Sequence, residues 1–208
     1  MDRRKEMVTH LYNLGFDTDP DVGAISLVRI PNWEKETMVF DDYLAGVPSI
    51  PERLIIDDAD FPYLCFADPR PGITRSCALL KVKYQELGYD DHSSEPFDDR
   101  FHIPDGPYWF RHDGGRKNRG RRPDHCRDEL DGGIRAGTDM EGLFAFAHDP
   151  SFFQIENVHF INLPGTVNRL NRDKCAFLVP LSGYEMLGLR GESDSGVERG
   201  SSLRVRLK

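Results

Sequence analysis

The sequence predicts an α+β fold, in which a mixed or mostly antiparallel sheet has a few helices packed on it. Short apolar runs typical of strands occur along the whole chain, without the regular strand–helix alternation of a parallel sheet. The length of 208 residues is that of one large domain or two small ones. We therefore expect a single globular domain over residues 1–190, either undivided or split into two lobes near residues 88–106.

The first predicted element is a helix from Arg3 to Leu14, because Met7, Leu11 and Leu14 fall on one helical stripe. Glycine 15 follows as a helix stop. Apolar, β-branched or aromatic composition then predicts strands at residues 24–30, 39–40, 53–56, 63–67 and 77–82.

Residues 88–106 lose the apolar pattern and carry many acidic side chains, which predicts a long loop or linker. An aromatic strand is expected at Tyr108-Trp109-Phe110, followed by a tight turn at Asp113-Gly114-Gly115. Proline at the first position favours a short helix over residues 123–130.

Thr138 and Glu141 match the spacing of a capping box, so a helix should begin at Thr138. Residues 149–153 are expected to form a further helical turn, and residues 160–163 and 176–179 buried strands, with a type II turn at residues 163–166. Residues 191–208 are expected to be a flexible C-terminal tail, in which the alternating Leu203–Leu207 could form an edge strand.

The charge is distributed very unevenly along the chain. The formal net charge is −8, yet residues 111–127 hold seven basic side chains against two aspartates. Such a concentration of like charge is unfavourable unless carboxylates of the protein or an anionic ligand lie nearby. The sequence leaves both explanations open.

The basic stretch and the turn near Gly165 predict a groove for an anion. Arginine binds phosphate or carboxylate through a planar fork, and a neighbouring aromatic ring could stack on a base. The candidate ligand-binding residues are Trp109, Arg111, Arg116, Lys117, Arg119, Arg122, Gly165 and Thr166. Nucleic acid is a disfavoured partner, because the remainder of the chain is strongly acidic.

Catalytic candidates are few. His112 and His125 could transfer protons, and Cys126 lies among cations that would lower the pKa of its thiol. The histidines and cysteines lack zinc-ligand spacing, so we expect no metal and no cofactor.

We expect neither a signal peptide nor a transmembrane helix, because no apolar run is long enough for either. The four cysteines include no C-x-x-C pair and are too few for a disulfide scaffold. These features favour a cytoplasmic protein with reduced thiols.

Five short motifs follow one another along the chain: Tyr108 with Asp113-Gly114-Gly115-Arg116, Thr138-x-x-Glu141-Gly142-Leu143, His148-x-Pro150, Leu163-Pro164-Gly165-Thr166, and Leu187-Gly188. Their order resembles that of a family of uncharacterised bacterial proteins with a single domain of unknown function. The resemblance covers Tyr108 to Leu189, with Thr166 where the family commonly has serine. It implies a bacterial, cytosolic protein and supplies no catalytic residues.

The sequence therefore favours a binding domain for a small anionic ligand that bears phosphate or carboxylate. The alternative is a hydrolase or transferase acting on a phosphorylated small molecule, with Arg116, Arg119 or Arg122 stabilising charge and His112 or His125 moving a proton. A third hypothesis is a protein interaction module that pairs through an exposed edge at Leu203–Leu207. The oligomeric state is left open.

Overall fold

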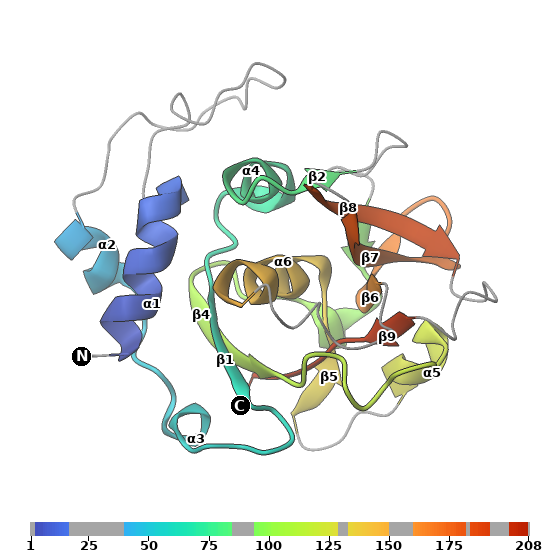
Figure 1. Cartoon of the computed structure of the whole chain (residues 1–208), viewed down its shortest axis with the longest axis horizontal. Helices are drawn as coiled ribbons and strands as arrows, with labels where there is room; N and C mark the ends of the chain where they lie inside the picture. Colours follow the sequence, from blue (N-terminus) through green and yellow to red (C-terminus); the bar gives the residue numbers. More distant parts are fainter. Residues whose placement is uncertain are drawn as a thin grey trace.

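Two β-sheets share one helix, α6 (Asp139–His148), which packs against strands of both (Figure 1). The computed structural model describes residues 3–16, 40–84, 94–128, 133–149, 160–181, 184–191 and 200–207. One cluster of buried apolar side chains includes members of both sheets and of α6, among them Phe66, Phe144 and Leu178. The two sheets therefore share a single hydrophobic core.

The other helices are α1 (Arg3–Leu11) with a π-helical turn at Tyr12–Phe16, α2 (Phe40–Gly46), α3 (Glu52–Ile55), α4 (Gly72–Leu79), a 3₁₀ turn at Asp99–Phe101, and α5 (Pro123–Asp128). The strands are β1 (Tyr63–Ala67), β2 (Lys83–Tyr84), β3 (Ser94–Pro96), β4 (Tyr108–His112), β5 (Ile134–Ala136), β6 (Phe160–Asn168), β7 (Lys174–Leu181), β8 (Tyr184–Gly191), β9 (Gly200–Ser202) and β10 (Arg204–Arg206).

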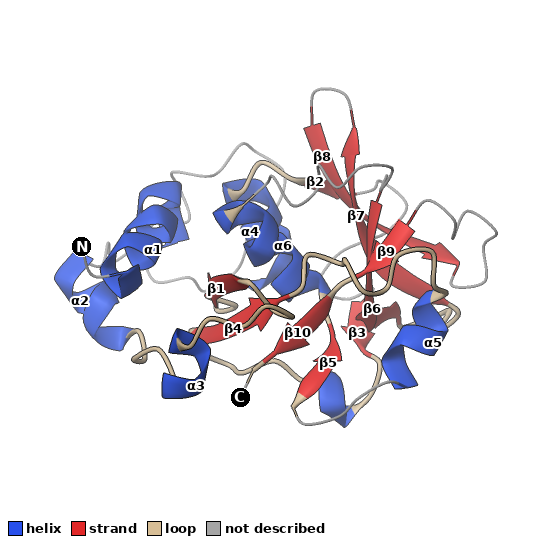
Figure 2. Cartoon of the chain, turned by 60° about the horizontal axis from the view of Figure 1, so that its bottom comes forward, coloured by secondary structure: helices blue, strands red, loops and turns tan. Residues whose placement is uncertain are grey.

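The first sheet has the strand order β1-β4-β10-β5, and the second has the order β2-β8-β7-β6-β3 with β9 added to β6 (Figure 2). All neighbours are antiparallel except the pairs β2–β8 and β6–β9. The predicted α+β fold with mostly antiparallel strands is therefore confirmed.

The predicted capping box fixes the start of α6. The Thr138 hydroxyl accepts from the amide of Glu141, and the Glu141 carboxylate accepts from the amide of Thr138. Gly142 then allows α6 to lie close to β6, since a Cβ there would sit only 2.5 Å from a methyl group of Leu163. Local capping and one small residue thus place α6 between the sheets.

Two predicted strands are helices instead. Residues 77–82 were expected to be extended, but residues 77–79 belong to α4, because Ile73, Cys77 and Leu80 recur at helical spacing and are all buried. Residues 53–56 mostly belong to α3, where Leu54 alone is buried while Ile55 and Ile56 are exposed. The predicted strand at residues 39–40 is also wrong at Phe40, which begins α2.

The turn expected at residues 163–166 is wrong too. β6 runs straight through Pro164 and Gly165, and its pairing with β7 shifts register between Leu163 and Val167. A bulge of this kind accepts a proline, because the ladder hydrogen bond is already interrupted there.

The C-terminal segment also differs from the prediction. β10 is an interior strand between β4 and β5, so Leu203–Leu207 is neither an edge strand nor a flexible tail. The side chains of Leu203 and Val205 are fully buried. This end of the chain therefore completes the first sheet.

The strand predicted at residues 24–30 and the turn at residues 150–153 lie outside the described residues. In the described part of the chain, every helix is too short or too polar to cross a lipid bilayer.

Candidate functional site

Arg111 is a buried structural residue. Its guanidinium donates to the carbonyl oxygens of Leu54 (2.8 Å), Phe61 (3.0 Å) and Pro62 (3.2 Å), and its side chain is 1% exposed. Burial lowers the pKa of this guanidinium from its ordinary value. Arg111 therefore fastens β4 to the segment between α3 and β1, and it faces no open surface.

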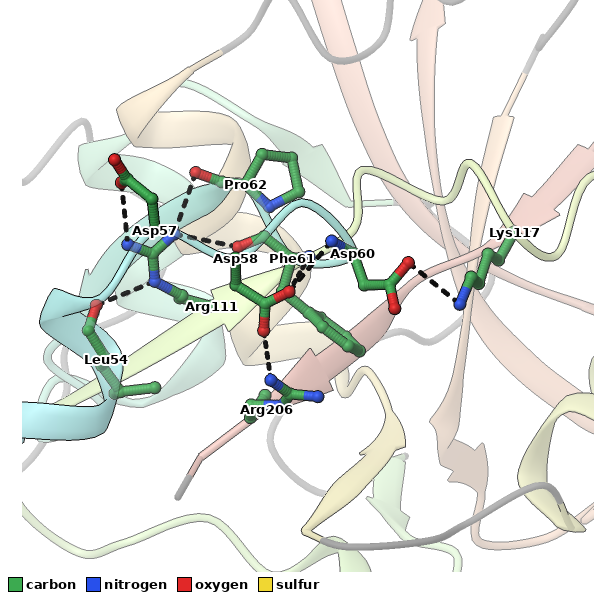
Figure 3. A network of polar contacts seen from close by, with 9 residues as sticks. All are labelled: Leu54, Asp57, Asp58, Asp60, Phe61, Pro62, Arg111, Lys117 and Arg206. Carbon is green, nitrogen blue, oxygen red and sulfur yellow. Dashed lines mark hydrogen bonds and ion pairs between the residues drawn. The ribbon is translucent and has the colours of Figure 1, made fainter.

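An acidic loop at residues 57–60 neutralises more of the local cations (Figure 3). Asp57 lies 3.7 Å from the Arg111 guanidinium, and Asp60 pairs with Lys117 at 3.1 Å. Asp58 pairs with Arg206 of β10. Carboxylates of the protein itself therefore lie beside Arg111 and Lys117, two cations of the basic stretch at residues 111–127.

The remaining cations of the stretch point to different places. Arg122 forms a two-pronged pair with Asp124, with donor–acceptor distances of 3.1 and 2.5 Å. Arg127 is buried, donates to the Pro164 carbonyl and lies over the ring of Phe97. Arg119 is exposed. The predicted groove residues therefore do not converge on one hollow.

The other candidate ligand residues are held by the fold. Trp109 is 3% exposed and donates its indole N–H to the Pro48 carbonyl, so its ring offers no stacking platform. The Gly165 amide donates to the Gly137 carbonyl at 3.0 Å. The Thr166 hydroxyl donates to the Asp139 carboxylate at 3.0 Å.

The three catalytic candidates lie on two elements: His112 is on β4, and His125 and Cys126 are neighbours on α5. His112 is fully buried, and burial lowers its pKa to about 3. Its Nδ1 accepts from the amide of Gly114 at 3.1 Å. Cys126 is buried in α5, whereas His125 beside it is exposed.

A cavity of about 450 Å³ lies between α1, β1 and the end of α6. Its lining residues are Arg3, Glu6, Met7 and His10 of α1, Pro62, Tyr63, Leu64 and Cys65 at β1, and His148 and Asp149 at the end of α6. This volume is within the usual range for small-molecule sites, roughly 300–1,000 Å³. The lining brings together two imidazoles, a guanidinium and two carboxylates.

The two imidazoles of the cavity are neighbours, with ring centroids 5.5 Å apart. His10 Nε2 lies 2.7 Å from the Ala147 carbonyl, and His148 Nε2 lies 2.8 Å from the Phe66 carbonyl. Because a carbonyl oxygen only accepts, Nε2 must carry a proton in both rings. Burial lowers the pKa of His148 to about 4, so this ring is neutral at pH 7.

Arg3 and Glu6 bring opposite charges to the cavity from successive turns of α1. Among the described residues, none forms a hydrogen bond or ion pair with either side chain. Tyr63 connects the cavity to the basic stretch, since its hydroxyl accepts from Arg116 at 2.6 Å and its ring lies under that guanidinium. Of the predicted ligand residues, Arg116 contacts the cavity wall through Tyr63, and Arg111 contacts it through the Pro62 carbonyl.

The sequence did contain a signal for half of this site. Arg3, Glu6, Met7 and His10 recur at spacings of three and four, which places them on one helical face. The opposite wall comes from β1 and α6, more than 50 residues away in the chain, and no local pattern joins them.

Within the described ranges, no group of three or more His, Cys, Asp or Glu side chains is arranged to hold a metal ion. Comparisons of the chain with protein-family models, with curated proteins and with solved structures found no match.

Proposed function

We propose that the chain is a binding domain for a small anionic ligand, bearing carboxylate or phosphate, and that the ligand occupies the cavity between α1 and β1. The observation that carries this proposal is the Arg3 guanidinium, which lines a cavity of about 450 Å³ without a partner among the described residues. A guanidinium matches the two oxygens of a carboxylate or phosphate through its planar fork. Arg116 adds a second cation behind Tyr63.

This proposal keeps the ligand class expected from the sequence and moves the site. The cations of residues 111–127 are largely engaged with backbone carbonyls and aspartates, as described above for Arg111, Lys117 and Arg122. Binding an anion there would require those contacts to be given up. A cytosolic location is part of the proposal, because all four cysteines are free and buried.

A thermal-shift titration of the full chain with inorganic phosphate, acetate and larger carboxylates tests the proposal. A ligand at 100 times its Kd stabilises the native state by about 2.7 kcal/mol. For a chain of this size that corresponds to roughly 5–10 °C in Tm. Arg3→Gln should abolish the shift, whereas Lys5→Gln, a cation on the same helix outside the cavity lining, should leave it intact. Equal shifts in both variants would refute the location.

The alternative function, a hydrolase or transferase acting on a phosphorylated small molecule, is favoured by the two imidazoles in the cavity wall. In that case His10 is the proton-transfer candidate, because it is exposed while His148 is half-buried. Release of phosphate from p-nitrophenyl phosphate, lost in His10→Gln, would support it. Unchanged background hydrolysis in the wild type would count against it.

A further inference from the structure

Among the described strands, β1 has a pairing partner on one side alone, and residues of β1 line the cavity. In an antiparallel ladder the N–H and C=O of one residue point to the same side, and successive residues alternate. The Asp113 amide donates to the Arg204 carbonyl of β10 at 3.2 Å. Because the direction alternates along β4, the backbone N–H and C=O of Arg111 also point to β10. Those of Phe110 and His112 point to β1.

The same alternation assigns the two sides of β1. Tyr63 and Cys65, which are opposite His112 and Phe110, take the ladder bonds to β4. The backbone groups of Leu64 and Phe66 must therefore point away from β4, toward the free edge of the sheet. The Phe66 carbonyl confirms this direction independently, because it accepts from His148, which lies outside the sheet.

Leu64 is the residue of β1 that both lines the cavity and directs its backbone groups away from β4. It lines the cavity, and β1 is the outermost strand of its sheet. The Phe66 carbonyl is already occupied by His148, whereas the N–H and C=O of Leu64 have no partner among the described residues and remain for a ligand. Unpaired edge groups of this kind bind the amide or carboxyl groups of another chain.

The size of the cavity limits what can pair with this edge. Helix α1 packs directly against β1, so a long strand has no room to lie along it. A volume of about 450 Å³ suits one residue with its end group. The apolar parts of the lining, which include Met7 and Pro62, can accommodate an apolar side chain.

Two charges of the lining, those of Arg3 and Glu6, fit the two ends of such a residue. Arg3 can bind a carboxylate bidentately, and Glu6, one turn further along α1, can accept from an ammonium or amide N–H. Neither side chain has a hydrogen-bond or ion-pair partner among the described residues. Phosphate alone would leave Glu6 facing a like charge.

We infer that the ligand of this cavity is an α-amino carboxylate, either a free amino acid or the C-terminal residue of a peptide. Its carboxylate binds Arg3, its α-nitrogen donates toward Glu6, and its backbone pairs with Leu64. This inference rests on the proposed anion-binding function and narrows its ligand class.

Four probes of one carbon skeleton test the inference by calorimetric titration of the full chain. L-leucine has both groups, N-acetyl-L-leucine imitates a peptide end, L-leucinamide lacks the carboxylate, and 4-methylpentanoate lacks the nitrogen. We expect the better of the first two to bind at least tenfold more tightly than either of the last two. Tighter binding of leucine identifies a free amino acid, and tighter binding of its N-acetyl form identifies a peptide end.

Two variants and one spectroscopic measurement locate the site. Arg3→Gln should raise the Kd of the tighter-binding probe, L-leucine or N-acetyl-L-leucine, at least tenfold. Lys5→Gln should leave this Kd unchanged. In the free protein the amide hydrogen of Leu64 should exchange with solvent faster than that of Cys65. Saturation with the tighter-binding probe should slow the exchange of the Leu64 amide hydrogen at least tenfold.

The outcomes separate this inference from the function on which it rests. If 4-methylpentanoate or inorganic phosphate binds as tightly as leucine and its N-acetyl form, the inference is overturned and anion binding stands. If no probe binds, both are overturned. A Leu64 amide as protected as that of Cys65 in the free protein would refute the edge assignment itself.

Discussion

Replacing Arg111 by methionine should destabilise the protein by about 3–5 kcal/mol, because three carbonyl oxygens lose a buried, charged hydrogen-bond donor. The side chain is 1% exposed and donates three hydrogen bonds to carbonyl oxygens of Leu54, Phe61 and Pro62. Bonds from a charged donor contribute roughly 1.5–3 kcal/mol each. Desolvation of the guanidinium, which also lowers its pKa, offsets part of that sum.

Urea unfolding followed by circular dichroism measures the change, provided that the slope of the transition stays constant. Arg111→Lys should fall between the wild type and the methionine variant, because one ammonium cannot reach three carbonyls as a planar fork does. The matched control is Arg122→Met, which breaks an exposed pair with Asp124 and should cost less than about 1 kcal/mol.

A different result would restore the interpretation that Arg111 binds the ligand. If Arg111→Met were as stable as Arg122→Met while losing the thermal shift given by carboxylate ligands, the residue would be functional rather than structural. The two interpretations thus predict opposite patterns in the same pair of experiments.

Three further predictions concern the buried polar groups and one open position. In the folded protein, burial lowers the pKa of His112 to about 3 and that of His148 to about 4. Below about pH 6.5 the unfolded chain therefore binds protons that the folded chain does not bind. The free energy of unfolding should fall by roughly 1.4 kcal/mol per pH unit and per histidine in this range. Urea unfolding at pH 7 and pH 5 would measure this slope, which His148→Gln should make shallower; an identical slope would contradict it. Glu141→Gln should cost about 3–5 kcal/mol, since it leaves the buried guanidinium of Arg135 without its carboxylate partner. A thermal melt matching the wild type would argue against that pair. Gly46→Ala should raise stability by about 0.4–1 kcal/mol, because no atom lies within 4 Å of the new methyl group, and a lower Tm would refute the reasoning.

The sequence predicted best those elements whose signals are local. The capping box of Thr138 and Glu141 involves neighbours in the chain, and the structure places both hydrogen bonds as the spacing requires. The strands at residues 63–67 and 108–110 were also correct, because their apolar and aromatic runs are short and clearly bounded.

The errors arose where a tertiary contact decides the conformation. An apolar run such as residues 77–82 suits a buried strand or a buried helix, and only the neighbours of α4 determine which. Leu203–Leu207 alternates like an edge strand, but its polar positions face partners that no local pattern announces: Arg206 pairs with Asp58, which lies 148 residues earlier.

The candidate site shows why the density of charge in a sequence is a poor guide to a binding site. A cation that already donates three hydrogen bonds, as Arg111 does, gains nothing from a ligand unless it first loses those bonds. A cation such as Arg3, which is exposed and has no hydrogen-bond or ion-pair partner among the described residues, gives up only water on binding. The free-energy difference between the two situations is several kcal/mol in favour of the isolated residue. Arg3 is therefore the better candidate, although it lies more than a hundred residues from the most basic part of the chain.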